Sequence, residues 1–103
     1  MATRTDRPKT TARRIGLVQM RCEPDADRNL ALAQDGIADA ARQGAEVVCL
    51  PELFRTPYLC QSEDAARFDW AEPIPGPSTE ALSKQARDLG VSIVASLFEK
   101  RAP

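Results

Sequence analysis

Short apolar runs alternate with longer segments of helical periodicity, and this alternation limits the possible folds more than any other feature. The runs at 15–20, 47–50 and 91–98 have the length of buried strands. Between them, the segments 27–43 and 77–89 place apolar residues three or four positions apart, as on one face of a helix. The order strand, helix, strand, helix, strand predicts an α/β fold whose neighbouring strands are largely parallel.

Capping residues and helix breakers predict where both helices begin and end. Asp25 or Asp27 can cap the start of the first helix, and Gly44 can end it. Pro77 suits the first turn of the second helix, and Gly90 suits its end. Three strands and two helices leave at least one face or edge of the sheet uncovered, so we interpret the chain as part of a larger domain.

The segment 51–77 has no helical or strand periodicity. It holds prolines at positions 51, 57, 73, 75 and 77 and four aromatic residues. Pro51 closes the apolar run at 47–50, because proline has no N–H to give to a sheet ladder. A connection this long without regular structure is uncommon in a compact domain and is usually functional. We therefore expect the functional site here.

Composition excludes several classes of protein. The chain has 103 residues, enough for one small domain, and its 43% hydrophobic and 28% charged residues are ordinary for a soluble globular protein. It has no histidine, which excludes Ser-His-Asp catalysis, Cys-His catalysis and His-ligated zinc within these residues. No apolar run approaches the roughly 18 residues that span a bilayer, and the first residues lack the apolar segment of a secretory signal. We expect a cytoplasmic protein that binds no membrane.

Charge divides the chain into a basic leader, 1–14, and an acidic body, 15–103. The leader holds five basic residues and one acidic residue, which leaves nine basic and 14 acidic residues in the body. An acidic body argues against nucleic-acid binding, which needs clustered lysine and arginine. The leader has no apolar periodicity and is predicted to be flexible; a transit peptide or a basic arm that binds a partner are the alternatives.

The three cysteines, Cys22, Cys49 and Cys60, are odd in number and form no CxxC pair. They indicate neither a disulfide framework nor a zinc site. Cys49 lies within an apolar run and is expected in the core. Cys22 and Cys60 lie where a thiolate could act, but the sequence places no histidine, lysine or helix N-terminus beside them, so a structural role is favoured.

Glu52 is the candidate catalytic residue. It follows the second predicted strand by two residues, and ligands of open α/β sheets bind beyond the carboxyl ends of the strands. A carboxylate walled there by Phe54 and Tyr58 would be partly desolvated, which suits a general base. From position alone, a solvated glutamate at a strand exit is the alternative. Tyr58 could likewise line a pocket or only pack the loop.

Five motifs occur in order along the chain, at residues 16–20, 44–54, 56–58, 72–77 and 96–101. Together they make the chain from residue 15 to 103 resemble the nitrilase superfamily of carbon-nitrogen hydrolases. The first strand and the Pro-Glu-Leu that ends the second are the most specific of them. Later motifs are similar to the N-carbamoylputrescine amidase branch.

The resemblance implies a fold and a catalytic set. The fold is a four-layer αββα sandwich that assembles into homo-oligomers, and this chain would be its N-terminal part. The catalytic set is Glu, Lys and Cys, with Glu52 as the glutamate and the other two downstream of Pro103. The implied chemistry needs no metal or organic cofactor. Tyr58 matches a position that lines the substrate pocket.

The function that the resemblance implies is hydrolysis of a small carbamoyl or amide substrate. The leading expectation is N-carbamoylputrescine, cleaved to putrescine, carbon dioxide and ammonia. Alternatives are a β-ureidopropionase-like or ω-amidase-like enzyme, or a short non-catalytic partner that pairs with full-length relatives. We expect residues 1–103 alone to be inactive, because the lysine and the cysteine are missing. We also expect them to fold poorly, because they form only part of the domain.

Overall fold

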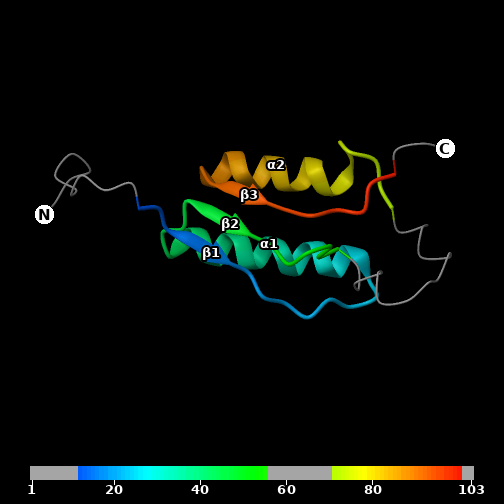
Figure 1. The fold of residues 1–103 in the computed structure, drawn as a ribbon, viewed down its shortest axis with the longest axis horizontal. Helices are drawn as coiled ribbons and strands as arrows, with labels where there is room; N and C mark the ends of the chain where they lie inside the picture. The colour runs from blue at the N-terminus through cyan, green and yellow to red at the C-terminus, as the bar shows by residue number, and fades with distance from the viewer. Residues whose placement is uncertain (1–11, 56–70, 101–103) are drawn as a thin grey trace, which may run out of the picture.

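A computed structural model describes residues 12–55 and 71–100. Five elements follow one another within these ranges (Figure 1): β1 (Ile15–Leu17), α1 (Ala26–Arg42), β2 (Val47–Cys49), α2 (Pro77–Leu89) and β3 (Ser92–Val94). The three strands form one sheet in the order β1-β2-β3, and both pairs are parallel. The predicted α/β fold with parallel strands is confirmed.

Helix α2 begins and ends at the predicted residues, and α1 begins and ends one residue before the predicted range of 27–43. Asp25, not Asp27, caps α1, because its Oδ1 accepts hydrogen bonds from the backbone N–H of Asp27 (3.0 Å) and Arg28 (3.3 Å). Gly44 follows the end of α1 and Gly90 follows α2, and both have a positive φ, of 95° and 68°. Neither helix in the described part of the chain is long and apolar enough to cross a membrane.

One face of the sheet packs against both helices. Gly16, Val48 and Ile93 lie in register on the three strands and face α1 and α2. Helix α1 packs against β1 and β2, and α2 packs against β3 and α1. The fully buried Val48 lies at the centre of the core, with Ala33, Ile37, Ala45, Phe54 and Leu82 around it.

The opposite face of the sheet is apolar and exposed among the described residues. Ile15, Leu17 and Val94 are 58%, 75% and 56% exposed. Cys49 lies in register with Leu17 and Val94 and is half-buried, so it belongs to this face. The expectation that Cys49 lies in the buried core is therefore wrong. The described residues therefore form one helical layer and one sheet, and the prediction of an uncovered sheet face is confirmed for them.

All three predicted strands are longer than the strands in the fold, the second by one residue because β2 ends at Cys49. The first and third were predicted at 15–20 and 91–98, but β1 ends at Leu17 and β3 at Val94. The ladder stops because the central strand β2 is followed by Pro51, which has no N–H, and then by a turn. Beyond β3 the chain pairs instead with Glu72, whose backbone N–H donates to Phe98 O (2.9 Å).

A glycine inside α1 allows the helix to approach β1 closely. A Cβ built on Gly36 would lie 2.6 Å from Cγ1 of Val18, which is inside van der Waals contact. Glycine costs about 1 kcal/mol relative to alanine within a helix. This cost is offset here by the close packing of α1 on the strand that continues into Val18.

Candidate active site

Glu52 lies in a turn directly after β2. The turn comprises residues 52–55 and leaves the sheet at its carboxyl end, on the side where both helices have their N-termini (Figure 1). The Glu52 side chain is exposed among the described residues. Leu53, the next residue, has a φ of 50°, a left-handed conformation that is uncommon for a residue with a branched side chain. The turn therefore needs support from its surroundings.

Phe54 supplies the apolar part of this support. Its side chain is fully buried in the core between the helices and the sheet, rather than beside Glu52 as expected from the sequence. Its carbonyl oxygen accepts a hydrogen bond from the Cys22 thiol (3.1 Å), which comes from the loop after β1. The turn is thus attached both to the core and to the neighbouring strand exit.

Asn29 supplies the polar part. It is fully buried in the first turns of α1, and its Nδ2 donates to Arg55 O (2.7 Å) and to Glu23 O (2.6 Å). Its Oδ1 accepts from the Glu23 N–H (2.7 Å). One amide side chain therefore holds the loop after β1 and the turn after β2 against the same helix. All its polar atoms have partners, as a buried amide requires.

The side chain of Arg55 joins three segments that are far apart in the sequence. Its guanidinium donates to the carboxylates of Asp27 (2.8 Å) and Glu72 (3.1 Å) and to the hydroxyl of Ser78. Glu72 in turn accepts from the Ser78 N–H (3.0 Å) and hydroxyl (2.9 Å). Arg55 and Glu72 side chains are only 16% and 14% exposed, and Ser78 is fully buried. We call Arg55, Asp27, Glu72 and Ser78 the Arg55 cluster.

The fold and these residues fall within the span that a known family matches. Residues 14–103 match the family model described as carbon-nitrogen hydrolase. The chain belongs to the carbon-nitrogen hydrolase family. This match includes Glu52, its turn and the whole Arg55 cluster.

Relatives of this carbon-nitrogen hydrolase chain include two kinds of amidase. It is 33% identical over 87 residues to an N-carbamoylputrescine amidase of Solanum lycopersicum, covering 84% of this chain and 29% of that protein. It is 40% identical over 81 residues to an omega-amidase of Xenopus tropicalis, covering 79% and 28%. A carbon-nitrogen hydrolase crystal structure from Helicobacter pylori superposes with a TM-score of 0.71 at 29% identity, covering 85% and 30%. The chain spans less than a third of the length of these proteins.

The sequence predicts the position of Glu52 but not the contacts that surround it. Glu52 stands at the carboxyl end of the sheet, where it was predicted, whereas Tyr58 and Cys60 lie outside the described residues. The Arg55 cluster was not predicted. Its members are 17 to 28 positions from Arg55 and follow no periodicity, so only the fold brings them together.

The two cysteines that the structure describes have no nucleophilic setting. Cys22 is half-buried and donates its thiol proton to a carbonyl, and burial raises the pKa of this thiol above its ordinary value. Because a thiolate is the nucleophile, a raised pKa makes Cys22 less reactive at neutral pH. Cys49 lies on the sheet face opposite the helices. The raised pKa and the thiol hydrogen bond support the structural role predicted for Cys22.

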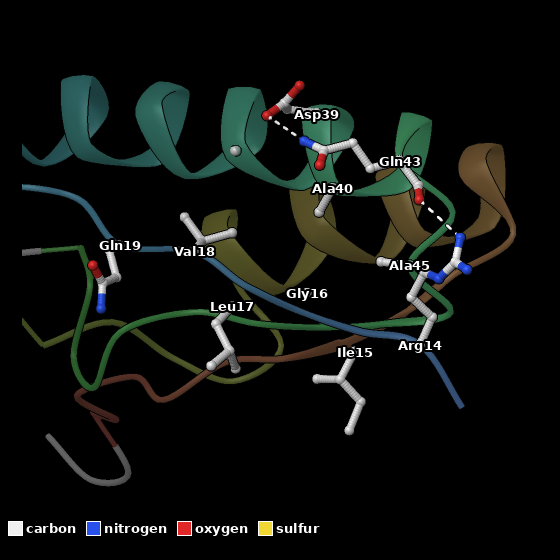
Figure 2. A pocket seen from close by; sticks show the side chains of 11 residues that line it. Arg14, Ile15, Gly16, Leu17, Val18, Gln19, Asp39, Ala40, Gln43 and Ala45 are labelled. Carbon is white, nitrogen blue, oxygen red and sulfur yellow. Dashed lines mark hydrogen bonds between the residues drawn. The ribbon is translucent and has the colours of Figure 1, made fainter. Parts of the chain in front are cut away.

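The cavity shown in Figure 2 is a separate feature. It measures about 390 Å³ and lies between the outer edge of β1 and the second half of α1. Arg14, Asp39 and Gln43 line its rim, and hydrogen bonds join Gln43 to both of the others. Glu52 and the Arg55 cluster are not among its lining residues. Residues 12–55 and 71–100 also hold no group of three or more side chains able to bind a metal ion.

Proposed function

We propose that the full-length protein containing this chain is an amidohydrolase that cleaves a non-peptide carbon-nitrogen bond, with Glu52 as its general base. The observation that carries the proposal is the position of Glu52 in this carbon-nitrogen hydrolase chain. It is an exposed carboxylate at the carboxyl end of a parallel sheet, on a turn that hydrogen bonds and a buried aromatic ring hold in place. Such a carboxylate can accept a proton from a nucleophile brought to this edge.

The proposed chemistry uses a cysteine and a lysine from the residues that follow Pro103. Glu52 accepts the thiol proton of the cysteine, and the thiolate attacks the carbonyl carbon of the substrate. The lysine stabilises the oxyanion of the tetrahedral intermediate. Glu52 then gives its proton to the departing nitrogen as the carbon-nitrogen bond breaks, which leaves a thioester-type intermediate. Water, deprotonated by Glu52, hydrolyses that intermediate and restores the thiol.

N-carbamoylputrescine is the substrate that we propose first. The motifs beyond Glu52, including residues 72–77, resemble those of the N-carbamoylputrescine amidase branch, and a plant enzyme of that name is among the relatives. The acidic body of the chain also suits a substrate with a cationic amine. Overall, one substrate molecule and one water give putrescine, carbon dioxide and ammonia. We place Tyr58 in the substrate pocket, and we propose a cytoplasmic homo-oligomer.

An ω-amide of a dicarboxylic acid is the second candidate. The omega-amidase from Xenopus tropicalis is 40% identical to this chain, against 33% for the tomato N-carbamoylputrescine amidase. The two substrates differ in charge, because the first ends in an ammonium group and the second in a carboxylate. They should therefore be distinguished sharply by one pocket.

The test is ammonia release by the protein expressed from the complete reading frame. The purified protein is incubated with N-carbamoylputrescine, β-ureidopropionate and a dicarboxylic acid monoamide, and kcat/KM is compared. The proposal expects the first to be preferred at least about tenfold, which corresponds to about 1.4 kcal/mol in the transition state. Preference for either other substrate would overturn the choice of substrate, and no release from any of them would overturn the amidohydrolase. Residues 1–103 alone should release none.

A further inference from the structure

We propose that the Arg55 cluster is a positioning device for Glu52. It fixes the turn in which the carboxylate must stand to exchange protons with the nucleophile. This inference rests on the proposed function, because it assumes that Glu52 is the general base. It goes further by assigning a role to three charged residues and one hydroxyl that do not themselves touch a substrate.

The turn is held at both of its ends. Pro51 follows β2 at the start, and at the other end Arg55 is bound through its backbone and its side chain at once. Its carbonyl oxygen accepts from buried Asn29 (2.7 Å), and its guanidinium binds two carboxylates and a hydroxyl. Only two residues lie between Glu52 and this doubly bound residue. A shift of Arg55 must therefore be passed to Glu52 with little loss.

The two residues between them would pass such a shift on to Glu52. Leu53 has the left-handed φ of 50°, and Phe54 has a side chain packed on all sides in the core. A backbone in a sparsely populated conformation persists only where its surroundings determine it. If the guanidinium contacts are lost, Leu53 can relax to a common conformation, and that relaxation turns the peptide that carries Glu52.

Two of the three charges in the cluster, Arg55 and Glu72, are largely buried, whereas Asp27 is 90% exposed. Arg55 and Glu72 are both about one-sixth exposed, so their attraction is screened less than at the surface. Glu72 is itself bound by the N–H and the hydroxyl of Ser78, at the N-terminus of α2. Asp27 lies in the first turn of α1. The contacts of the guanidinium thus fix the position of the turn relative to both helices.

Variants of the full-length protein test this role. Arg55→Gln removes the positive charge, and Arg55→Lys keeps the charge but lacks the several N–H donors of the guanidinium. Glu72→Gln weakens the contact between Glu72 and Arg55, and it serves as the milder variant in case Arg55→Gln does not fold. Arg42→Gln is the matched control, because Arg42 pairs with Asp39 on the surface at 71% and 60% exposure. We measure kcat and KM for ammonia release. We also follow alkylation of the downstream catalytic cysteine by iodoacetamide, with the site assigned by mass spectrometry.

A positioning role and a merely structural role give different results. Displacing Glu52 should lower kcat by about 30-fold, since small misplacements of catalytic groups cost up to about 100-fold. KM should stay within about threefold, and the alkylation should keep its full amplitude but slow about tenfold, because the thiol has lost its base. Arg55→Lys should recover part of both rates, Glu72→Gln should give a smaller loss of the same kind, and Arg42→Gln should match the wild type.

Three outcomes would overturn the inference. The first is an Arg55→Gln protein with wild-type kcat and alkylation rate. The second is a reduced alkylation amplitude at an unchanged rate constant, which would mean that the variant only lowers the folded fraction. The third is a wild-type protein that hydrolyses no substrate, which removes the proposed function and this inference with it. Activity in the wild type with no effect of Arg55→Gln removes this inference alone.

Discussion

Two arginines, Arg55 and Arg14, hold opposite ends of the same sheet by contacts of different kinds. At the carboxyl end, Arg55 is 16% exposed and binds two carboxylates, a hydroxyl and a carbonyl. At the amino end, exposed Arg14 donates from Nη1 to Gln43 O (3.2 Å) and from its backbone N–H to Glu46 (3.2 Å). Buried contacts fix a position, whereas exposed contacts of this kind contribute little to stability.

The difference shows that the loops at the carboxyl end of the sheet are held more firmly than the chain at its amino end. Three loops meet at the carboxyl end, and Asn29, Phe54 and the Arg55 cluster hold them there; Asp27 is the one largely exposed member of this set. At the amino end, backbone pairing between Arg14 and Glu46 joins the starts of β1 and β2, and the exposed side chain of Arg14 joins them to the end of α1 at Gln43. Changes at the carboxyl end should therefore alter activity or stability strongly. Changes at the amino end should do neither.

The largest effect is expected from Glu52→Gln. Loss of a general acid-base group lowers rates by about 10²- to 10⁴-fold, so kcat for ammonia release from the full-length protein should fall within this range. Because the side chain is exposed and carries none of the turn's contacts, the unfolding free energy should stay within about 0.5 kcal/mol of the wild type. Glu80→Gln, at an exposed carboxylate in the first turn of α2, is the control. A Glu52→Gln enzyme with more than a tenth of wild-type kcat would contradict the assignment.

A smaller effect, mainly on stability, is expected from Asn29→Ala. The change leaves the N–H and the carbonyl of Glu23 and the carbonyl of Arg55 without their partner. Each buried polar group left unpaired costs about 1–3 kcal/mol, and water can reach some of them, so we expect a total loss of about 3 kcal/mol. Urea unfolding of the full-length protein measures this loss.

Gln43→Ala is the matched control for Asn29→Ala. Gln43 lies at the other end of α1, and its amide makes an exposed hydrogen bond to Asp39 (3.1 Å). Its loss should change the unfolding free energy by less than about 0.5 kcal/mol. Equal effects of the two variants would show that the carboxyl end is held no more firmly than the amino end.

Local chemistry explains which features the sequence predicts correctly. The order of elements follows from apolar periodicity, and the ends of the helices follow from a capping aspartate, a proline and two glycines that act on their neighbours alone. Glu52 could be placed because the end of β2 is marked by Pro51. Each of these predictions depends on residues within a few positions of one another.

Tertiary contacts explain what the sequence does not predict. The apolar run at 91–98 predicts a strand longer than Ser92–Val94. The prediction fails because apolar residues after a strand can also pack against a core without joining the sheet, as Leu97 does. Arg55, Glu72 and Ser78 resemble surface residues by type, and only the meeting of three loops buries them. Asn29 falls among polar residues at the start of α1, and nothing in the pattern marks it as buried.

The smallest effect is expected from Arg14→Gln. The side chain is exposed and its one hydrogen bond goes to a carbonyl, while the backbone of residue 14 keeps its pairing with Glu46 in the variant. The unfolding free energy should change by less than about 0.5 kcal/mol, and kcat should not change. Urea unfolding and ammonia release, measured beside Arg55→Gln, decide the point. A loss of activity in Arg14→Gln comparable with that in Arg55→Gln would mean that both ends of the sheet position Glu52, because the amino end would then have to act through β2 on the same turn.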